Sequence, residues 1–356
     1  MSMRNFDGSF WLLSALVLLT SCRGDPASHH SLGGGVSGDS PSSAREIEGG
    51  TAQSAFPVLP ENVVVLRTGS FSAEAENRPW SGWWWPSNDA RILKSLEKWD
   101  RARNRLRTTS LAAQFEEDEL LDASALPWEG HCDAWAMAAI ATQEPTVPVS
   151  WGGETFSVAD QKALLVKAFE KVSGKTVVGS PFRGDRLSDY SEISPVAFHR
   201  VLQSELFEKE RPFVLDKDPG IPVWNTPIWK AEVKVSMIQA DEWLVTTWLW
   251  GADPWVEDLS GLGTRVIQLG YVYRLRGTPL PDGSLAVNEG EWVADEIGLI
   301  DSRVDHPDFV VLIPSPGEYQ AESRNIWIDS ALVRDLFAPD SRGLNASFSA
   351  SSFIEE

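Results

Sequence analysis

The chain has 356 residues, and its 31 lysines and arginines against 51 aspartates and glutamates give a formal net charge of −20. Hydrophobic residues make up 42% and charged residues 23%, which is typical of a soluble globular protein. The acidity argues against nucleic acid as a partner, because phosphate binding needs clustered basic residues. Two cysteines are too few for a disulfide scaffold, and the histidines show no zinc-binding pattern.

Residues 1–21 are predicted to be a signal peptide. Arg4 precedes an apolar run over residues 10–19, which is too short to span a bilayer as a helix. Leu19-Thr20-Ser21-Cys22 then resembles a bacterial lipobox, in which the peptidase cuts before the cysteine that receives lipid. We expect a lipid on Cys22, export, and anchoring to the cell membrane or outer membrane, facing the periplasm or the exterior. The alternative is an ordinary secretory signal with a chance cysteine.

Three segments are expected after the signal peptide. Residues 22–57 contain almost no large apolar side chains before residue 56 and predict a flexible tether. Residues 58–316 are expected to form the folded domain, with its core reaching to about residue 230 and a β-rich extension after it. Residues 317–356 are expected to form a C-terminal segment that ends in a loose, serine-rich tail.

Hydrophobic spacing predicts helices in the first half of the folded part. Residues 88–107 carry apolar side chains three to four positions apart, and residues 132–142 are alanine-rich. Ser157-Val158-Ala159-Asp160 resembles a capping box at the start of a helix that Gly174 terminates.

Strands are predicted in the second half. Residues 198–206 and 212–215 are apolar-rich runs on either side of a polar turn, which predicts an antiparallel hairpin. Further strands are expected over residues 231–238, 243–250, 265–274, 291–294 and 309–313. Helices followed by strands indicate an α+β fold.

One cysteine has a setting that suits catalysis. Cys132 begins the helix predicted over 132–142, and the positive end of a helix stabilises a thiolate, although Asp133 partly opposes this. A nucleophilic thiolate also needs a base and a group that orients the base. His199 and Asp216 are 216 − 199 = 17 residues apart, so the predicted hairpin would place them side by side. The alternative is a buried structural cysteine and an unrelated histidine.

Tryptophan is used far more often than tyrosine, at 17 residues against 4. Trp80, Trp83, Trp84 and Trp85 crowd into residues 78–86. Three interpretations remain open: core packing, the apolar walls of a cleft, or platforms on which sugars stack.

A set of short segments keeps one order between Pro79 and Phe309, and Gly130-His131-Cys132-Asp133-Ala134-Trp135-Ala136 is among them. The segments are residues 78–86, 130–136, 144–145, 153–156, 159–164, 195–199, 211–216, 223–227 and 306–309. With these segments in this order, the chain resembles the elicitor-type transglutaminase family of oomycetes and bacteria. Thr226 stands where the family usually has glutamine, and Asp133 where histidine or glycine is expected.

The resemblance implies a papain-like transglutaminase fold, in which a cysteine-bearing helix packs on an antiparallel sheet. It implies Cys132 as nucleophile, His199 as base and Asp216 as the residue that orients the imidazole. His306 ranks below His199, because Pro307-Asp308 suggests a turn. The reaction would join protein glutamine to lysine through a Cys132 thioester. An oxyanion would be held by the Cys132 backbone N–H and by the indole of Trp80, Trp83, Trp84 or Trp85.

Two alternatives and several minor expectations accompany this hypothesis. The same three residues would serve a papain-like protease, amidase or deamidase, and a chain without thiol chemistry would be a surface binding module. No cofactor or metal is required: residues 216–220 resemble the start of a calcium loop but lack its remaining ligands. The expected partners are proteins that carry glutamine and lysine, and the membrane through Cys22. We expect a monomer.

Overall fold

The computed structural model describes residues 63–180, 192–220, 222–315 and 318–338. The predicted signal peptide, the tether and Cys22 lie outside these ranges, as does the serine-rich tail. None of the helices in the described ranges is long and apolar enough to cross a membrane.

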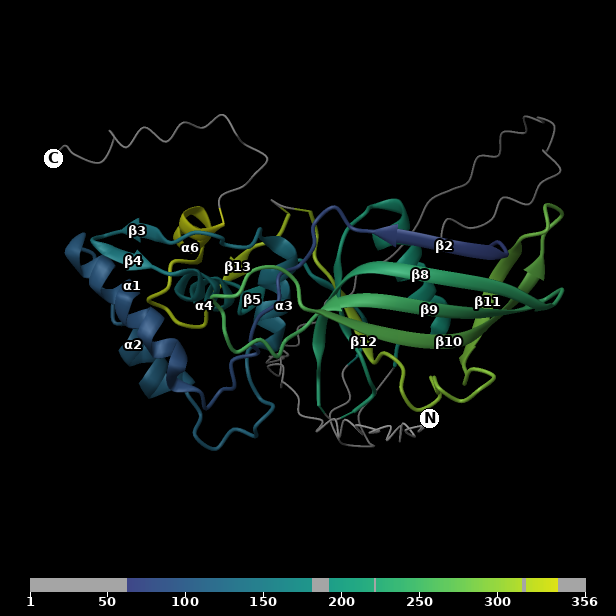
Figure 1. Ribbon diagram of the computed structural model, residues 1–356, viewed down its shortest axis with the longest axis horizontal. Helices are drawn as coiled ribbons and strands as arrows, with labels where there is room; N and C mark the ends of the chain where they lie inside the picture. The colour runs from purple at the N-terminus through teal and green to yellow at the C-terminus, as the bar shows by residue number, and fades with distance from the viewer. Residues whose placement is uncertain (1–62, 181–191, 221, 316–317, 339–356) are drawn as a thin grey trace, which may run out of the picture.

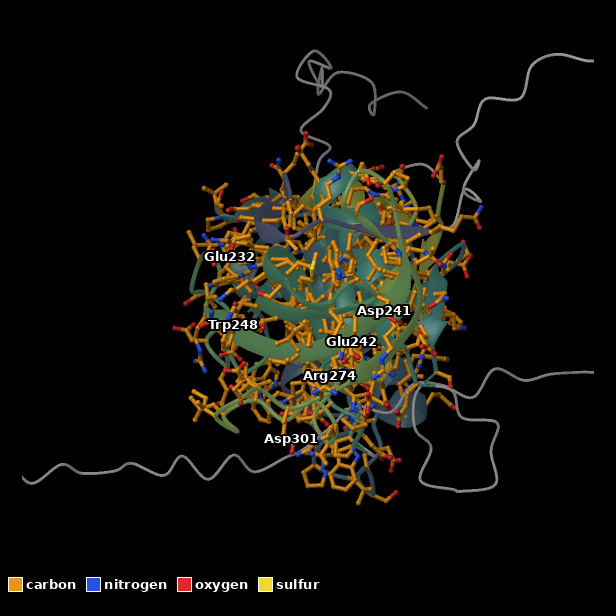
Figure 2. The ribbon with its side chains drawn as sticks, turned by 90° about the vertical axis from the view of Figure 1, so that its right-hand side faces the viewer. Glu232, Asp241, Glu242, Trp248, Arg274 and Asp301 are labelled. Carbon is orange, nitrogen blue, oxygen red and sulfur yellow. The ribbon has the colours of Figure 1, made fainter. Side chains whose placement is uncertain are left out.

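An antiparallel sheet of nine strands organises the part of the chain that the structure describes. Its strand order is β1-β11-β10-β9-β8-β7-β12-β6, and β2 pairs with β8 outside this path. Along β9 buried side chains alternate with more exposed ones, and charged residues such as Glu242 and Arg274 lie on the outer face of the sheet, where they form an ion pair (Figure 2). The strands are β1 (Val64–Leu66), β2 (Gly69–Glu74), β6 (Thr176–Gly179), β7 (Phe213–Asp216), β8 (Asn225–Gln239), β9 (Glu242–Ala252), β10 (Val266–Pro279), β11 (Leu285–Trp292) and β12 (Phe309–Leu312).

Helices α1, α2, α4 and α6 gather at one end of the molecule and the long strands lie at the other, with α3 where the two parts meet (Figure 1). Two short antiparallel strand pairs, β3 with β4 and β13 with β5, lie among these helices. The elements are η1 (Ala90–Ile92), α1 (Leu93–Arg105), α2 (Ala112–Phe115), η2 (Glu116–Leu120), α3 (Cys132–Ala141), β3 (Val149–Trp151), β4 (Glu154–Phe156), α4 (Val158–Ala168), β5 (Lys171–Val172), β13 (Ala321–Glu322) and α6 (Ser330–Phe337).

Two hydrophobic cores meet at β7. The first core joins α1, α3, α4 and α6, and the second joins α5 (Pro195–Val201) and η3 (Leu202–Glu208) to the long strands. Neighbouring residues of a strand face opposite sides, so Val214 packs in the first core and Leu215 in the second. By the same alternation, the Asp216 side chain faces the first core, to which α3 belongs.

Several predicted elements are present. Residues 132–141 form α3, and Ser157 and Asp160 make both hydrogen bonds of a capping box at the start of α4. The α+β fold class, with the cysteine-bearing helix packed against an antiparallel sheet, is confirmed. Within the predicted C-terminal segment, α6 buries Val333 and Phe337 in the first core.

The hairpin predicted over residues 198–215 is wrong. Residues 195–208 are helical instead, and β7 pairs with β8 and β12. Pro195 occupies the first turn of α5, and the Ser194 hydroxyl accepts a hydrogen bond from the Ala197 N–H at 3.2 Å. A capping serine followed by proline is a helix-start signal, and it outweighs the β-like apolar run.

Candidate active site

The loop before α3 places Cys132 beside the tryptophan segment. The N–H of His131 donates to the carbonyl oxygens of Trp84 at 2.7 Å and Trp85 at 3.1 Å. A Cβ added at Gly130 would lie 2.4 Å from the Trp85 oxygen, so this approach requires glycine. Trp85 itself has a φ of 41°, in the left-handed region that non-glycine residues seldom occupy. Cys132 is thus fully buried at the first residue of α3.

The sulfur of Cys132 lies against the start of β8. The side-chain amide of Asn225 donates to Sγ at 3.3 Å, and the carbonyl oxygen of Val223 lies 3.7 Å from Sγ. Sequence reasoning did not single out Asn225, although it lies within the matching segment 223–227.

Asp216 lies next to this contact. It pairs with Asn225 across β7 and β8, and its Oδ1 accepts a hydrogen bond from the Trp224 N–H at 2.7 Å. Its Oδ2 is buried and has no hydrogen-bond partner within the described part of the chain. Burial, together with the charges of Asp218 and Asp308, raises the pKa of Asp216 well above its usual value. The structure therefore brings Cys132 and Asp216 together through Asn225.

His199 is not brought to this place. Its Nδ1 lies 2.7 Å from the hydroxyl of Tyr273 on β10, and β9 and β8 separate β10 from β7. Tyr273 packs in the second core, whereas Asp216 faces the first. Burial lowers the pKa of His199 to about 4. The expected pairing of His199 with Asp216 fails because His199 lies on α5 and not on a strand beside β7.

His306 lies beside a strand that pairs directly with β7, unlike His199. It precedes β12, which pairs with β7 through Val310 and Leu215. Its Nε2 lies 2.7 Å from a carboxylate oxygen of Glu192, and its ring stacks on Trp292 at 5.4 Å. Its Nδ1 is buried and makes no hydrogen bond to any residue that the structure describes.

The four tryptophans of residues 78–86 are buried in the first core, as the core interpretation predicted. The indole N–H of Trp80 donates to Thr142 Oγ1 at 3.4 Å, and that of Trp83 donates to an Asp89 carboxylate oxygen at 3.4 Å. The indole N–H of Trp84 is buried and has no acceptor among the described residues. Of these three indoles, Trp84 is therefore the one with an uncommitted donor.

Trp84 also belongs to a row of rings, the tryptophan wall, made of Trp83, Trp84, Trp255 and Trp224. Trp84 lies 3.8 Å from Trp83 and 4.4 Å from Trp255, measured between ring centroids. Trp255 lies 4.9 Å from Trp224, whose backbone N–H binds Asp216. Trp255 is 37% exposed, so the wall runs from the surroundings of Cys132 to the protein surface.

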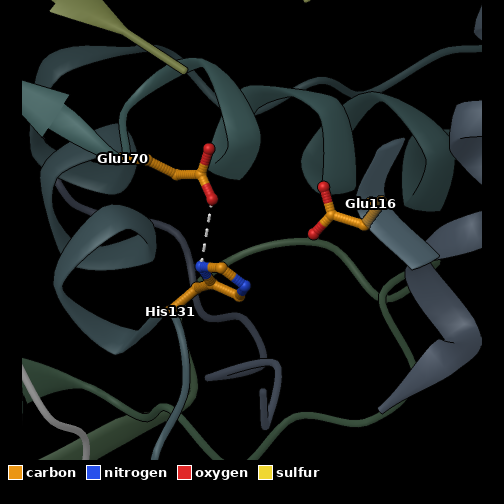
Figure 3. A group of neighbouring side chains, drawn as sticks. All are labelled: Glu116, His131 and Glu170. Carbon is orange, nitrogen blue, oxygen red and sulfur yellow. Dashed lines mark ion pairs between the residues drawn. The ribbon is translucent and has the colours of Figure 1, made fainter. Parts of the chain in front are cut away.

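A buried group beside the site has the composition of a metal centre. Glu116, His131 and Glu170 bring ligand atoms within 4.8 Å of one another (Figure 3). The Lys167 ammonium lies 2.8 Å from a Glu116 oxygen and also binds Glu170, so it already supplies a cation there. Burial lowers the pKa of His131 to about 3, which leaves it neutral. The group is therefore a buried ion-pair network, which we call the Lys167 network.

The segment that contains this site matches the model of a known protein family. Residues 117–262, which include Cys132, Asp216 and Asn225, match the model of the transglutaminase elicitor family. The expected resemblance to this family is confirmed. Among solved structures, the GP42 transglutaminase from Phytophthora sojae is similar, with 20% identity and a TM-score of 0.50 over 74% of this chain and 91% of that one. This likeness shows a shared fold. No curated protein matches the chain.

Proposed function

We propose that this transglutaminase-like chain is a catalytic transglutaminase. The Cys132 thiolate attacks the side-chain amide of a protein glutamine, ammonia leaves, and a thioester forms. A lysine amine then displaces the thiolate and leaves an isopeptide bond. The observation that carries the proposal is the contact of Cys132 with Asn225 and, through it, with Asp216, inside the segment that matches the family model.

Groups around Cys132 suit the charges that develop in this reaction. The N-terminus of α3 carries a positive partial charge, and the Asn225 amide donates to the sulfur, so both favour a thiolate. The tetrahedral intermediate places negative charge on the former amide oxygen. We assign the Cys132 backbone N–H and the indole N–H of Trp84 as its hydrogen-bond donors, because the indoles of Trp80 and Trp83 already have acceptors.

The reaction also needs a group that accepts the thiol proton and delivers it to the leaving ammonia. We assign this role to His306, whose strand β12 lies beside the strand of Asp216 and whose Nδ1 has no partner in the described part of the chain. His199 is set aside because Tyr273 holds it in the other core.

The tryptophan wall favours an amine over water as the second reactant, since apolar walls exclude solvent from the thioester. Hydrolysis of the same thioester would make the protein a protease, amidase or deamidase. A chain that forms no thioester would be a binding module. The acidic surface attracts lysine-rich acceptor proteins at long range.

We further propose that the protein acts as a monomer outside the cytoplasm, held to a membrane by lipid on Cys22. We also propose that the reaction requires no cofactor and no calcium.

The test is incorporation of a fluorescent primary amine into casein by the mature protein, with and without calcium. A reductant is included to keep the Cys132 thiol reduced during the assay. We expect incorporation that disappears in Cys132→Ala and persists in Ser150→Ala, a control on the exposed β3 strand. Cleaved casein without incorporation would support a protease, glutamate formation without incorporation a deamidase, and no change in casein a binding module.

A further inference from the structure

A cavity lies in the second core, away from Cys132, between the β1–β2 corner, η3 and β8. Its volume is about 500 Å³, which is within the usual range for sites that bind small molecules. In Figure 1, β2 runs beside β8 at the end of the molecule where the long strands lie. Most of the lining is apolar, and it includes Val65, Leu66, Phe71, Leu202, Val233 and Val235.

One buried polar side chain reaches this cavity. His199 lines it while only 4% of the residue is exposed. The charged side chains at the cavity, Arg67 and Glu208, belong to exposed residues. Arg67 is paired with Asp282 at 2.9 Å, so it does not supply a free cation to a ligand. Recognition in the depth of the cavity therefore depends on His199.

A hydrogen-bond chain fixes the orientation of the His199 ring. The hydroxyl of Tyr273 lies 2.7 Å from Nδ1 and 3.1 Å from Thr247 Oγ1. A phenol is a stronger donor than a neutral imidazole N–H, so we assign the tyrosine as donor to Nδ1 and the threonine as donor to the tyrosine. The remaining proton of the neutral ring is then on Nε2, which has no hydrogen-bond partner within the residues described. His199 offers one donor.

The wall next to His199 is built from an unusual helical turn. Directly after α5 the chain forms the π-helix η3, which contributes Leu202 and Gln203 to the lining. Gln203 is tied to β1, because its side-chain amide donates to the Val65 carbonyl oxygen at 3.2 Å. Segments of π-helix are uncommon and are frequent at functional sites. The cavity is thus formed by elements that hydrogen bonds hold together.

From these observations we propose that the cavity binds an uncharged, largely apolar small molecule that carries one hydrogen-bond acceptor, such as a ketone or an ester carbonyl. The apolar body fills the space between Leu202, Val233 and Val235, and the acceptor receives the Nε2–H of His199. A carboxylate is disfavoured, because the cavity offers no unpaired cation to compensate its charge. This site is separate from Cys132 and does not depend on the proposed acyl transfer.

The test compares two ligands of nearly the same shape, 2-acetylnaphthalene and 2-ethylnaphthalene, which differ in the carbonyl oxygen. Each displaces N-phenyl-1-naphthylamine from the full chain, and the fluorescence gives its dissociation constant. We expect the ketone to bind five- to tenfold more tightly, as one buried hydrogen bond supplies about this factor. Equal affinities, or no saturable binding, would overturn the proposal.

Variants locate the site. His199→Phe should remove the preference for the ketone, whereas His199→Gln, which keeps a donor, should retain part of it. Val65→Trp, at a half-buried lining position, should weaken both ligands together. The imidazole nitrogen resonances of wild-type His199 give a reading that needs no variant: they should shift with the ketone and stay in place with the hydrocarbon. The reverse result, or a preference that survives in His199→Phe, would place the ligand elsewhere.

Discussion

Asn225 donates its side-chain amide to the sulfur of Cys132 at 3.3 Å, across 93 positions of sequence. The same residue pairs with Asp216 on the neighbouring strand. Asn225 is thus the link between the candidate nucleophile and the buried carboxyl group. A donor at this distance stabilises a sulfur anion more than a neutral thiol.

Asn225→Ala should therefore raise the pKa of the reduced Cys132 thiol. We expect the midpoint of the pH profile for alkylation by iodoacetamide to move upward by about one unit, with a tenfold or greater loss of amine incorporation at neutral pH. An alkylation profile that coincides with the wild type would show that Asn225 does not act on the sulfur.

His306→Gln should lower amine incorporation by a hundredfold or more, which is the usual contribution of a general acid or base. Glu192→Gln keeps the side-chain length at the partner of His306 and serves as the matched control, with a smaller effect expected. Substantial activity in His306→Gln would show that His306 is not the proton carrier and would favour His199 instead.

Trp84→Phe removes the indole N–H and keeps an aromatic ring in the tryptophan wall. If this N–H holds the oxyanion, kcat should fall about a hundredfold while the rate of iodoacetamide alkylation stays unchanged. Trp80→Phe is the matched control, because the Trp80 indole is already bound to Thr142. Similar losses in the two variants would indicate a general packing effect.

Lys167→Met should destabilise the fold strongly, because it leaves the Glu116 and Glu170 carboxylates buried without their cation. Breaking a buried ion pair in this way costs about 3–5 kcal/mol, measurable by urea unfolding. The exposed Lys171→Met should change the free energy of unfolding by less than about 0.5 kcal/mol. Stabilisation of the wild type by added zinc or calcium would contradict the interpretation of this group as an ion-pair network.

The low pKa of His199 predicts a loss of stability in acid. Its pKa is about 4 when folded and about 6.5 when unfolded, so below pH 6.5 the unfolded chain binds the extra proton. The penalty grows as the pH falls from 6.5 towards 4 and reaches about 2 kcal/mol at pH 5. His131 acts in the same direction, and the raised pKa of Asp216 acts in the opposite one. The difference between wild type and His199→Gln in urea unfolding at pH 7.5 and pH 5 isolates the His199 contribution, and equal pH dependence would contradict it.

Local signals in the sequence predicted those parts of the molecule that depend on local chemistry. Ser157 and Asp160 lie three residues apart and interact within one helical turn, so the sequence alone predicts this capping box. The position of Cys132 at the start of α3 followed from an alanine-rich segment after Gly130 in the same way.

The partners of the site residues depend on the three-dimensional fold. His199 and Tyr273 are separated by 74 positions, and no local pattern indicates that they meet. The run over residues 198–206 has apolar side chains that suit either a strand or a helix, and the cap at Ser194 decides for the helix. The link from Cys132 to Asn225 likewise appears only when α3 docks on β8.

The Lys167 network has a consequence for the order in which the molecule is completed. The Asn325 amide donates to Glu116, and the Ser323 hydroxyl and Arg324 N–H donate to Glu170. The Glu170 carboxylate lies 3.3 Å from Nδ1 of His131, the residue before Cys132. The residues that hold Glu116 and Glu170 in place beside Cys132 thus lie almost two hundred positions further along the chain. During synthesis or export, a chain that has emerged only as far as β12 holds Cys132, Asn225 and Asp216 but lacks this support. Competence for chemistry is therefore reached late, after the segment around Asn325 has arrived.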